Sequence, residues 1–405
     1  MGAAERLMRY CRIDTQSDPA SGLHPSTAKQ FDLANLLVRE LKELGIEDAY
    51  LDEHCYVYGH LESNIGKEVP TVGFAAHMDT APDYTGTGVN PRLIENFDGC
   101  DIDLGDGVVT SMADFPQMKL LRGKTLMVTD GKTLLGADDK AGITAIMEAL
   151  AFWKEHPEKK HGRIAVAFTP DEEIGEGPMF FDYERFNAAF AYTMDGDRVN
   201  ELNDETFNAA SAQVTFRGFS IHPGSAKNKM INAAALACEY HSLLPAYMVP
   251  EHTEGREGFI HMVSMQGNTE TAQLGYILRD HDRGLLEEKK KLMEAAAAYI
   301  RAKYGENTAE VKTEDRYPNM KEVLVNHPEV SETAWQAIID LGYEPENVPV
   351  RGGTDGALMS FRGLPCPNLG TGGGNYHGRY EYCCMEELED AVRLIVRIAE
   401  RTAGE

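Results

Sequence analysis

The N-terminal half of the chain alternates between helical and strand-like patterns of apolar residues. Between residues 27 and 45 apolar residues recur at positions 31, 33, 36, 37, 41 and 44, which is the spacing of a helix that Gly45 would end. Short continuous apolar runs and a further amphipathic helical pattern follow; the runs cover residues 71–76, 163–169 and 189–194, and the helix residues 139–156. Short apolar strands separated by helices predict a mostly parallel sheet with helices on both faces.

The pattern changes near residue 208, where apolar and polar residues begin to alternate. Such alternation is typical of antiparallel strands with one exposed face. The predicted elements are strand, helix, strand, strand, helix and strand, over residues 208–220, 232–244, 258–267, 271–282, 285–303 and 309–317. This β-α-β-β-α-β order predicts a ferredoxin-like α+β domain. Because helix and strand alternation returns afterwards, we predict an α/β domain of residues 1–207 and 319–405, with a smaller domain of residues 208–318 inserted.

Composition excludes several classes of partner. The formal charge of −26 argues against nucleic acid, whose phosphates need clustered Lys and Arg. No apolar run approaches the roughly 20 residues needed to span a bilayer, and the N-terminus has no basic segment followed by an apolar core. Seven scattered cysteines without a CxxC motif fit reduced thiols. We therefore expect a cytoplasmic protein that binds neither nucleic acid nor membrane, in which the adjacent pair Cys383 and Cys384 is simply semi-buried.

Histidine and acidic residues follow the ends of the predicted strands. In open α/β sheets ligands bind beyond the carboxyl ends of the strands. Five separate segments deliver such residues to what should be one edge: His77 and Asp79; Asp138 and Asp139; Asp171, Glu172 and Glu173; Asp195; and His377. Each segment alone has an ordinary interpretation, because a strand cap, a helix N-cap or a solvated acidic loop would look the same. Their coincidence at one edge favours a functional site.

Imidazole and carboxylate ligands without thiolates suit Zn²⁺, and also Mn²⁺ or Co²⁺, in a hydrolytic centre. Two such metals about 3.5–4 Å apart can generate a nucleophilic hydroxide and polarise a carbonyl. Asp79, two positions after His77, would face the same side of a strand and accept the free N–H of that histidine. Of the adjacent Glu172 and Glu173, one could bind metal while the other takes a proton from the water.

The segments "HMDT", "GADDKAG", "TPDEEIG", "TMDG" and "NYHG", in this order and spacing, resemble the M20 family of di-zinc metallopeptidases. The likeness extends through "HPGSAK" and "VRGGTDG" and runs from the N-terminus to about residue 400. It implies a catalytic domain with an inserted lid, and release of the N-terminal residue from short peptides, mainly tripeptides. A dipeptidase, a carboxypeptidase, an N-acyl-amino-acid hydrolase or a non-catalytic binding protein stays open.

The resemblance also assigns roles to residues. His77 and Asp195 would bind one zinc, Glu173 and His377 the other, and Asp138 would bridge them, because the family's bridging Asp precedes a cis peptide bond and a Lys two positions on. Glu172 would be the general base on a bridging water, with Asp79 orienting His77.

Substrate-binding residues are expected mostly in the inserted domain. His222 in "IHPGSAK" would reach the developing oxyanion, although in isolation it reads as a turn residue. Asn232 and Arg279 match lid positions associated with substrate. Arg351 is a candidate clamp for the peptide's terminal carboxylate, with a helix-flanking ion pair as the alternative. An exposed sheet edge of the lid would pair two subunits into a homodimer.

Overall fold

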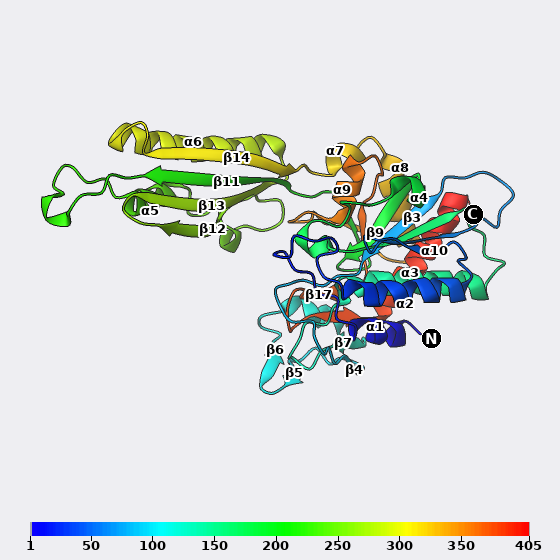
Figure 1. The fold of residues 1–405 in the computed structure, drawn as a ribbon. Coiled ribbons are helices and arrows are strands. Elements are labelled where there is room, and N and C mark those ends of the chain that lie inside the picture. Colours follow the sequence, from blue (N-terminus) through cyan, green and yellow to red (C-terminus); the bar gives the residue numbers. More distant parts are fainter. Residues whose placement is uncertain (1, 405) are drawn as a thin grey trace. The chain divides into compact units, whose positions relative to one another are not determined.

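The structure is a computed structural model that describes residues 2–404 and divides into two compact units (Figure 1). The first unit contains residues 2–204, 323–348 and 354–404, and the second contains residues 205–322 and 349–353. The sequence pattern predicted that the inserted domain contains residues 208–318 and that residues 349–353 belong to the larger domain, whereas the structure places residues 349–353 in the second unit. No helix in the described part of the chain is long and apolar enough to cross a membrane.

A mixed eight-stranded sheet forms the centre of the first unit. Its strands run in the order β1 (Tyr50–Leu51), β2 (Val57–Leu61), β8 (Ile164–Thr169), β3 (Val72–His77), β9 (Phe190–Gly196), β16 (Asn368–Gly370), β10 (Glu201–Asn203) and β15 (Glu346–Asn347). The pairs β8–β3, β3–β9 and β9–β16 are parallel, so these four strands end at the same edge. The predicted α/β fold is confirmed, and the parallel part of the sheet is the part that carries the predicted site.

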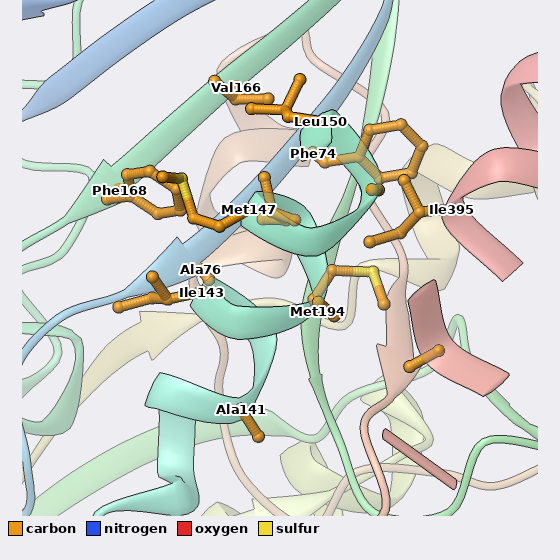
Figure 2. Close-up of a cluster of buried hydrophobic side chains, with 14 of the residues drawn as sticks. Phe74, Ala76, Ala141, Ile143, Met147, Leu150, Val166, Phe168, Met194 and Ile395 are labelled. Atoms are coloured by element: carbon orange, nitrogen blue, oxygen red, sulfur yellow. The ribbon is translucent and has the colours of Figure 1, made fainter. Parts of the chain in front are cut away.

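Helices cover this sheet, and α3 (Ala137–Glu155) is the most buried of the long ones. Figure 2 shows Ile143, Met147 and Leu150 of α3 among side chains of the neighbouring strands, including Phe74 and Phe168. Because α3 contacts β3 and β9 along its length, its N-terminus is fixed at their carboxyl ends. The other helices of this unit are α1 (Ala3–Cys11), α2 (Gln30–Leu44), α4 (Tyr183–Phe186), α8 (Pro328–Asp340), α9 (Asp355–Phe361) and α10 (Met385–Ala403).

A smaller antiparallel sheet in the first unit escaped the sequence interpretation. It joins β17 (Gly373–Gly374), β18 (Tyr382–Cys384), β7 (Leu126–Val128) and β4 (Arg92–Ile94), and a separate hairpin pairs β5 (Ile102–Gly105) with β6 (Val108–Thr110). These strands are two to four residues long, too short to show a period in the sequence. The sheet matters for the site because the turn carrying His377 lies between β17 and β18.

The second unit is built on a four-stranded antiparallel sheet. The strand order is β12 (Phe259–Gly267), β13 (Thr271–Asp280), β11 (Asn208–Arg217) and β14 (Ala309–Tyr317), and the helices are α5 (Ala233–Leu243) and α6 (Arg283–Tyr304). Both helices pack on β11 and β13 and on each other, so they cover one face. Buried and partly exposed residues alternate along β13, as the sequence pattern predicted. The ferredoxin-like arrangement is confirmed, with β12 and β14 as its edge strands.

Candidate metal centre

Seven predicted site residues come together at the carboxyl ends of the parallel strands of the first unit. Each is delivered by a short, well-defined element: His77 and Asp79 by the end of β3, Asp195 by β9, Glu172 and Glu173 by the 3-10 turn Glu172–Ile174 after β8, Asp138 by the start of α3, and His377 by the turn after β17. The eight-stranded sheet and the small antiparallel sheet together therefore bring His77 close to His377, 300 positions later in the sequence.

Asp138 lies between the two histidines. Its Oδ1 is 2.9 Å from Nε2 of His77, and its Oδ2 is 3.4 Å from Nε2 of His377. On the outer sides, Asp195 Oδ1 is 3.6 Å from Nε2 of His77, and Glu173 Oε2 is 3.0 Å from Nε2 of His377. One carboxylate oxygen thus faces each histidine, and each histidine has a second carboxylate beside it. This is the donor arrangement of a bridged pair of cations.

Asp139 has a different environment from Asp138. The peptide bond between the two is cis. The Asp139 carboxylate accepts the backbone N–H of His77 at 3.1 Å and that of Gly142 at 3.1 Å. It therefore fixes the end of β3 against the first turn of α3, although its oxygens also come within ligand distance of His77 and Asp195.

Asp79 orients the ring of His77 through its backbone carbonyl oxygen as well as through its carboxylate. Nδ1 of His77 lies 3.1 Å from the backbone carbonyl oxygen of Asp79 and 3.3 Å from its carboxylate Oδ1. The Asp79 carboxylate also accepts the backbone N–H groups of Glu172, at 3.0 Å, and Glu173, at 3.2 Å. With Nδ1–H donating to Asp79, Nε2 keeps its lone pair for a cation. Asp79 thus holds both the histidine and the turn that carries the two glutamates.

Buried negative charge accumulates at this place. Burial, together with the charge of Asp138, raises the pKa of Glu173 to about 8. Burial likewise raises the pKa of Asp195 to about 6. Hydrogen bonds to Asp138 and Glu173 raise the pKa of His377 to about 11. Within residues 2–404, Oε1 of Glu173 is buried without a hydrogen-bond partner. Crowded carboxylates with an unused buried oxygen fit bound cations, which would supply the missing positive charge.

The carboxylate of Glu172 lies near these groups but makes no hydrogen bond with them. Its backbone is held by Asp79, but no hydrogen bond to its carboxylate occurs among the described residues. Burial raises the pKa of this carboxyl well above its ordinary value, and the charges of Asp195 and Asp355 add to the effect. The arrangement leaves Glu172 free to exchange a proton.

Two acidic residues of the site were missed by the sequence interpretation. Asp355, at the start of α9, accepts the hydroxyl of Thr169 at 2.7 Å, and burial raises its pKa to about 7. Glu381 accepts the backbone N–H of Asp138 at 3.0 Å, together with those of Leu135 and Gly136. It thereby fixes the start of α3. Asp355 could have been noticed because it lies in "GGTDG", whereas nothing in the sequence around Glu381 marks it.

The four predicted substrate-binding residues all lie in the second unit. Nδ1 of His222 accepts the backbone N–H of Gly224 at 3.1 Å, so its proton is on Nε2. Asn232 caps α5, with Oδ1 accepting the N–H of Ala234 at 3.0 Å. Arg279 donates to the carbonyl oxygen of Leu278 on its own strand, β13, and to that of Ala210 on the neighbouring strand, β11.

Arg351 has contacts that neither sequence interpretation anticipated. Its guanidinium donates to the carbonyl oxygens of Gly255 and Glu257 at 2.8 Å each, and to Oγ1 of Thr253 at 2.9 Å. It also lies over the ring of Phe207. The side chain ties residues 349–353 to the loop of residues 253–257, instead of forming the helix-flanking ion pair that was the alternative.

Comparisons with known proteins show which family the chain belongs to. The model of the peptidase family M20/M25/M40 matches residues 128–401. Peptidase T of Lysinibacillus sphaericus is 51% identical over 396 residues, covering 98% of this chain and 97% of that protein. The structure of aminopeptidase PepT from Bacillus cereus superimposes with a TM-score of 0.77 at 24% identity and covers 99% of this chain and 98% of that one.

A more distant neighbour shares the fold. The Bacillus subtilis protein YXEP, described as a dinuclear metal binding peptidase, has a TM-score of 0.66 at 15% identity, covering 98% of this chain and 97% of that one. The resemblance noted in the sequence is confirmed over nearly the whole chain. With its family match and its 51% identical relative, the chain belongs to the peptidase family M20/M25/M40.

Proposed function

We propose that the protein is a tripeptide aminopeptidase that releases the N-terminal residue from short peptides by metal-assisted hydrolysis. The placement of Asp138 between His77 and His377 carries this proposal, because it provides two cation positions joined by one carboxylate. The 51% identity with a peptidase T over nearly the full chain supports the choice of short peptides.

The metal ligands we propose are those on either side of Asp138. His77 and Asp195 would hold one Zn²⁺, Glu173 and His377 the other, and Asp138 would bridge them; Mn²⁺ or Co²⁺ suits the same oxygen and nitrogen donors. Two such cations, when bound, lower the pKa of a water and polarise the scissile carbonyl.

Glu172 is the proposed proton carrier. Its carboxylate is held at the site by the backbone hydrogen bond to Asp79 and accepts no hydrogen bond from the described residues, so it can take a proton from the attacking water and give it to the leaving amine. A raised pKa suits this task, since the group must both accept and release a proton near neutral pH.

We propose that the second unit acts as a lid that contributes to substrate binding. His222 is suited to donate to the developing oxyanion, because its Nδ1 is occupied by Gly224 and its Nε2–H is not. Asn232 can contribute only its amide N–H groups, since its oxygen caps α5. Arg279 is the third candidate. Arg351 is better suited to holding the loop of residues 253–257 in place than to clamping a carboxylate.

Assembly and compartment complete the proposal. On the edge strand β12, Val263 is 54% and Met265 49% exposed, and the β12–β13 register shifts at this point. An exposed edge with apolar side chains favours pairing with a second copy of this chain, and we propose a homodimer. All seven cysteines are free, which is consistent with a reducing cytoplasm.

The deciding experiment is a comparison of free, N-blocked and C-amidated di-, tri- and tetrapeptides, with products identified by mass. The proposal expects release of the N-terminal residue from free tripeptides and loss of cleavage on N-blocking. Preferred cleavage of N-acylated peptides would instead indicate an N-acyl-amino-acid hydrolase. Release of the C-terminal residue would indicate a carboxypeptidase, and preference for two-residue substrates a dipeptidase. Full metal content without activity on any peptide would indicate a binding protein.

A further inference from the structure

A second group of possible metal ligands lies in the first unit, outside the centre described above. It consists of His24, in the loop before α2, and Asp171 and Glu176, which flank the turn carrying Glu172 and Glu173. The side chains of His24 and Asp171 are 6% and 0% exposed, and that of Glu176 is 39% exposed. An imidazole and two carboxylates therefore share a largely buried place with one side open to solvent.

The hydrogen bonds around His24 determine which of its nitrogens is protonated. The hydroxyl of Tyr56 donates to the carbonyl oxygen of Gly177 at 2.5 Å and lies 3.0 Å from Nε2 of His24. Because that hydroxyl proton is already used, Nε2–H of His24 must be the donor to the tyrosine oxygen. In the neutral ring Nδ1 then carries a lone pair. Nδ1 is buried, has no hydrogen-bond partner among the described residues, and faces the two carboxylates.

Distances within the group favour shared ligation over a hydrogen bond. Nδ1 of His24 is 3.3 Å from Oδ2 of Asp171 and 3.8 Å from Oε2 of Glu176. A charge-assisted N–H···O bond would be roughly 2.7–2.9 Å long. Two ligand atoms each about 2.1 Å from a tetrahedral zinc are roughly 3.4 Å apart. The observed separations are close to the second value.

Asp171 is fixed in a position to bind. Its Oδ1 accepts the hydroxyl of Ser26 and the amide of Gln30, and its Oδ2 accepts only the backbone N–H of Ser26, at 2.6 Å. A carboxylate oxygen has two lone pairs, so Oδ2 keeps one for a cation. The backbone N–H of Glu176 donates to the carbonyl oxygen of Asp171, which brings the third side chain to the same place.

We propose that His24, Asp171 and Glu176 bind a third divalent cation, Zn²⁺ or Mn²⁺, at a site separate from the bridged pair. Nitrogen and oxygen donors in this number leave room for water ligands, as those ions accept. A cation here would join the loop before α2 to both ends of the turn that carries Glu172 and Glu173. It would thereby hold that turn in position without touching substrate.

Metal counting tests this site without relying on activity. Wild type, His24→Ala and Glu176→Gln are loaded with Zn²⁺ or Mn²⁺, freed of excess metal by gel filtration, and measured by mass spectrometry of the metal. We expect each variant to hold one equivalent less than wild type. Glu176→Gln keeps the size of a half-exposed side chain, so its fold should persist, and its melting temperature is recorded to verify this.

His54→Ala is the matched control. The ring of His54 stacks on Phe180 at 4.2 Å and lies 6.2 Å from the ring of His24, but it contacts neither Asp171 nor Glu176. This variant should bind as much metal as wild type. The same one-equivalent difference should persist in a His377→Ala background, so a failure of the bridged centre would not be mistaken for a failure of this site. Equal metal content in wild type, His24→Ala and Glu176→Gln would overturn the proposal.

Discussion

Replacing Glu172 by glutamine gives the sharpest test of the proposed chemistry. The amide has nearly the same shape as the carboxyl but cannot accept the proton of the attacking water. General-base catalysis contributes about 10²–10⁴ in rate, or roughly 3–5 kcal/mol of barrier. We therefore expect kcat to fall by that factor. Because no described residue donates to the Glu172 carboxylate, the substitution breaks no hydrogen bond, and metal content should stay unchanged.

The structure also predicts the effect of this substitution on stability. Burial and the charges of Asp195 and Asp355 oppose ionisation of Glu172, so a neutral amide should leave the melting temperature unchanged or higher. The assay combines tripeptide turnover, metal analysis and thermal unfolding on the same preparation. Glu173→Gln is the matched control. Oε2 of Glu173 lies 3.0 Å from Nε2 of His377, so loss of the negative charge of Glu173 should lower the metal content. A Glu172→Gln enzyme that keeps more than roughly a tenth of wild-type kcat would refute the assigned role.

Three further substitutions test other parts of the structure. Asp79→Asn replaces one of the two carboxylate oxygens that accept the N–H groups of Glu172 and Glu173, so the free energy of unfolding should fall by about 1–3 kcal/mol. An unchanged melting temperature would contradict this. Burial raises the pKa of Glu201 to about 7, above its unfolded value, so its charge destabilises the fold as the pH rises through 4.5 to 7. Glu201→Gln should therefore raise the melting temperature at pH 8 and not at pH 4, and equal shifts at both would contradict the reasoning. Met265→Lys places a charge on the exposed edge of β12 and should convert dimer to monomer in light scattering; a wild-type protein that is already monomeric would disprove the proposed dimer.

Long periodic segments made much of the fold predictable. The pattern ending at Gly45 corresponds to α2 (Gln30–Leu44), where Gly45 takes the left-handed conformation with φ of 97°. The apolar runs became β3, β8 and β9 because a strand buried on both faces has no polar positions. The two-residue strand β17 has no such signature, so the small sheet became visible only through tertiary pairing.

The candidate site was predictable to the extent that strand ends determine position. Parallel strands bring His77, Glu173 and Asp195 to one edge whatever their separation in the sequence, and this follows from the sheet alone. The hydrogen bonds from the backbone of Glu172 and Glu173 to Asp79 could not be predicted in this way, because they depend on where the N–H groups of the turn after β8 point. That direction is set by Asp171, which has φ of 57°, a backbone conformation that the sequence does not reveal.

Arg351 shows why residue type is a weaker guide in the second unit. A planar guanidinium suits a peptide carboxylate, but it equally suits two carbonyl oxygens and a hydroxyl offered by one loop. The structure supplies the latter in Gly255, Glu257 and Thr253, all within 2.9 Å of the guanidinium nitrogens. Donors already used in this way would have to break those bonds to bind a substrate. A side chain whose donors have no such partners is therefore better suited to bind the carboxylate of a peptide. The prediction of Arg351 as a clamp rested on residue type alone, because the sequence does not show which residues surround its side chain.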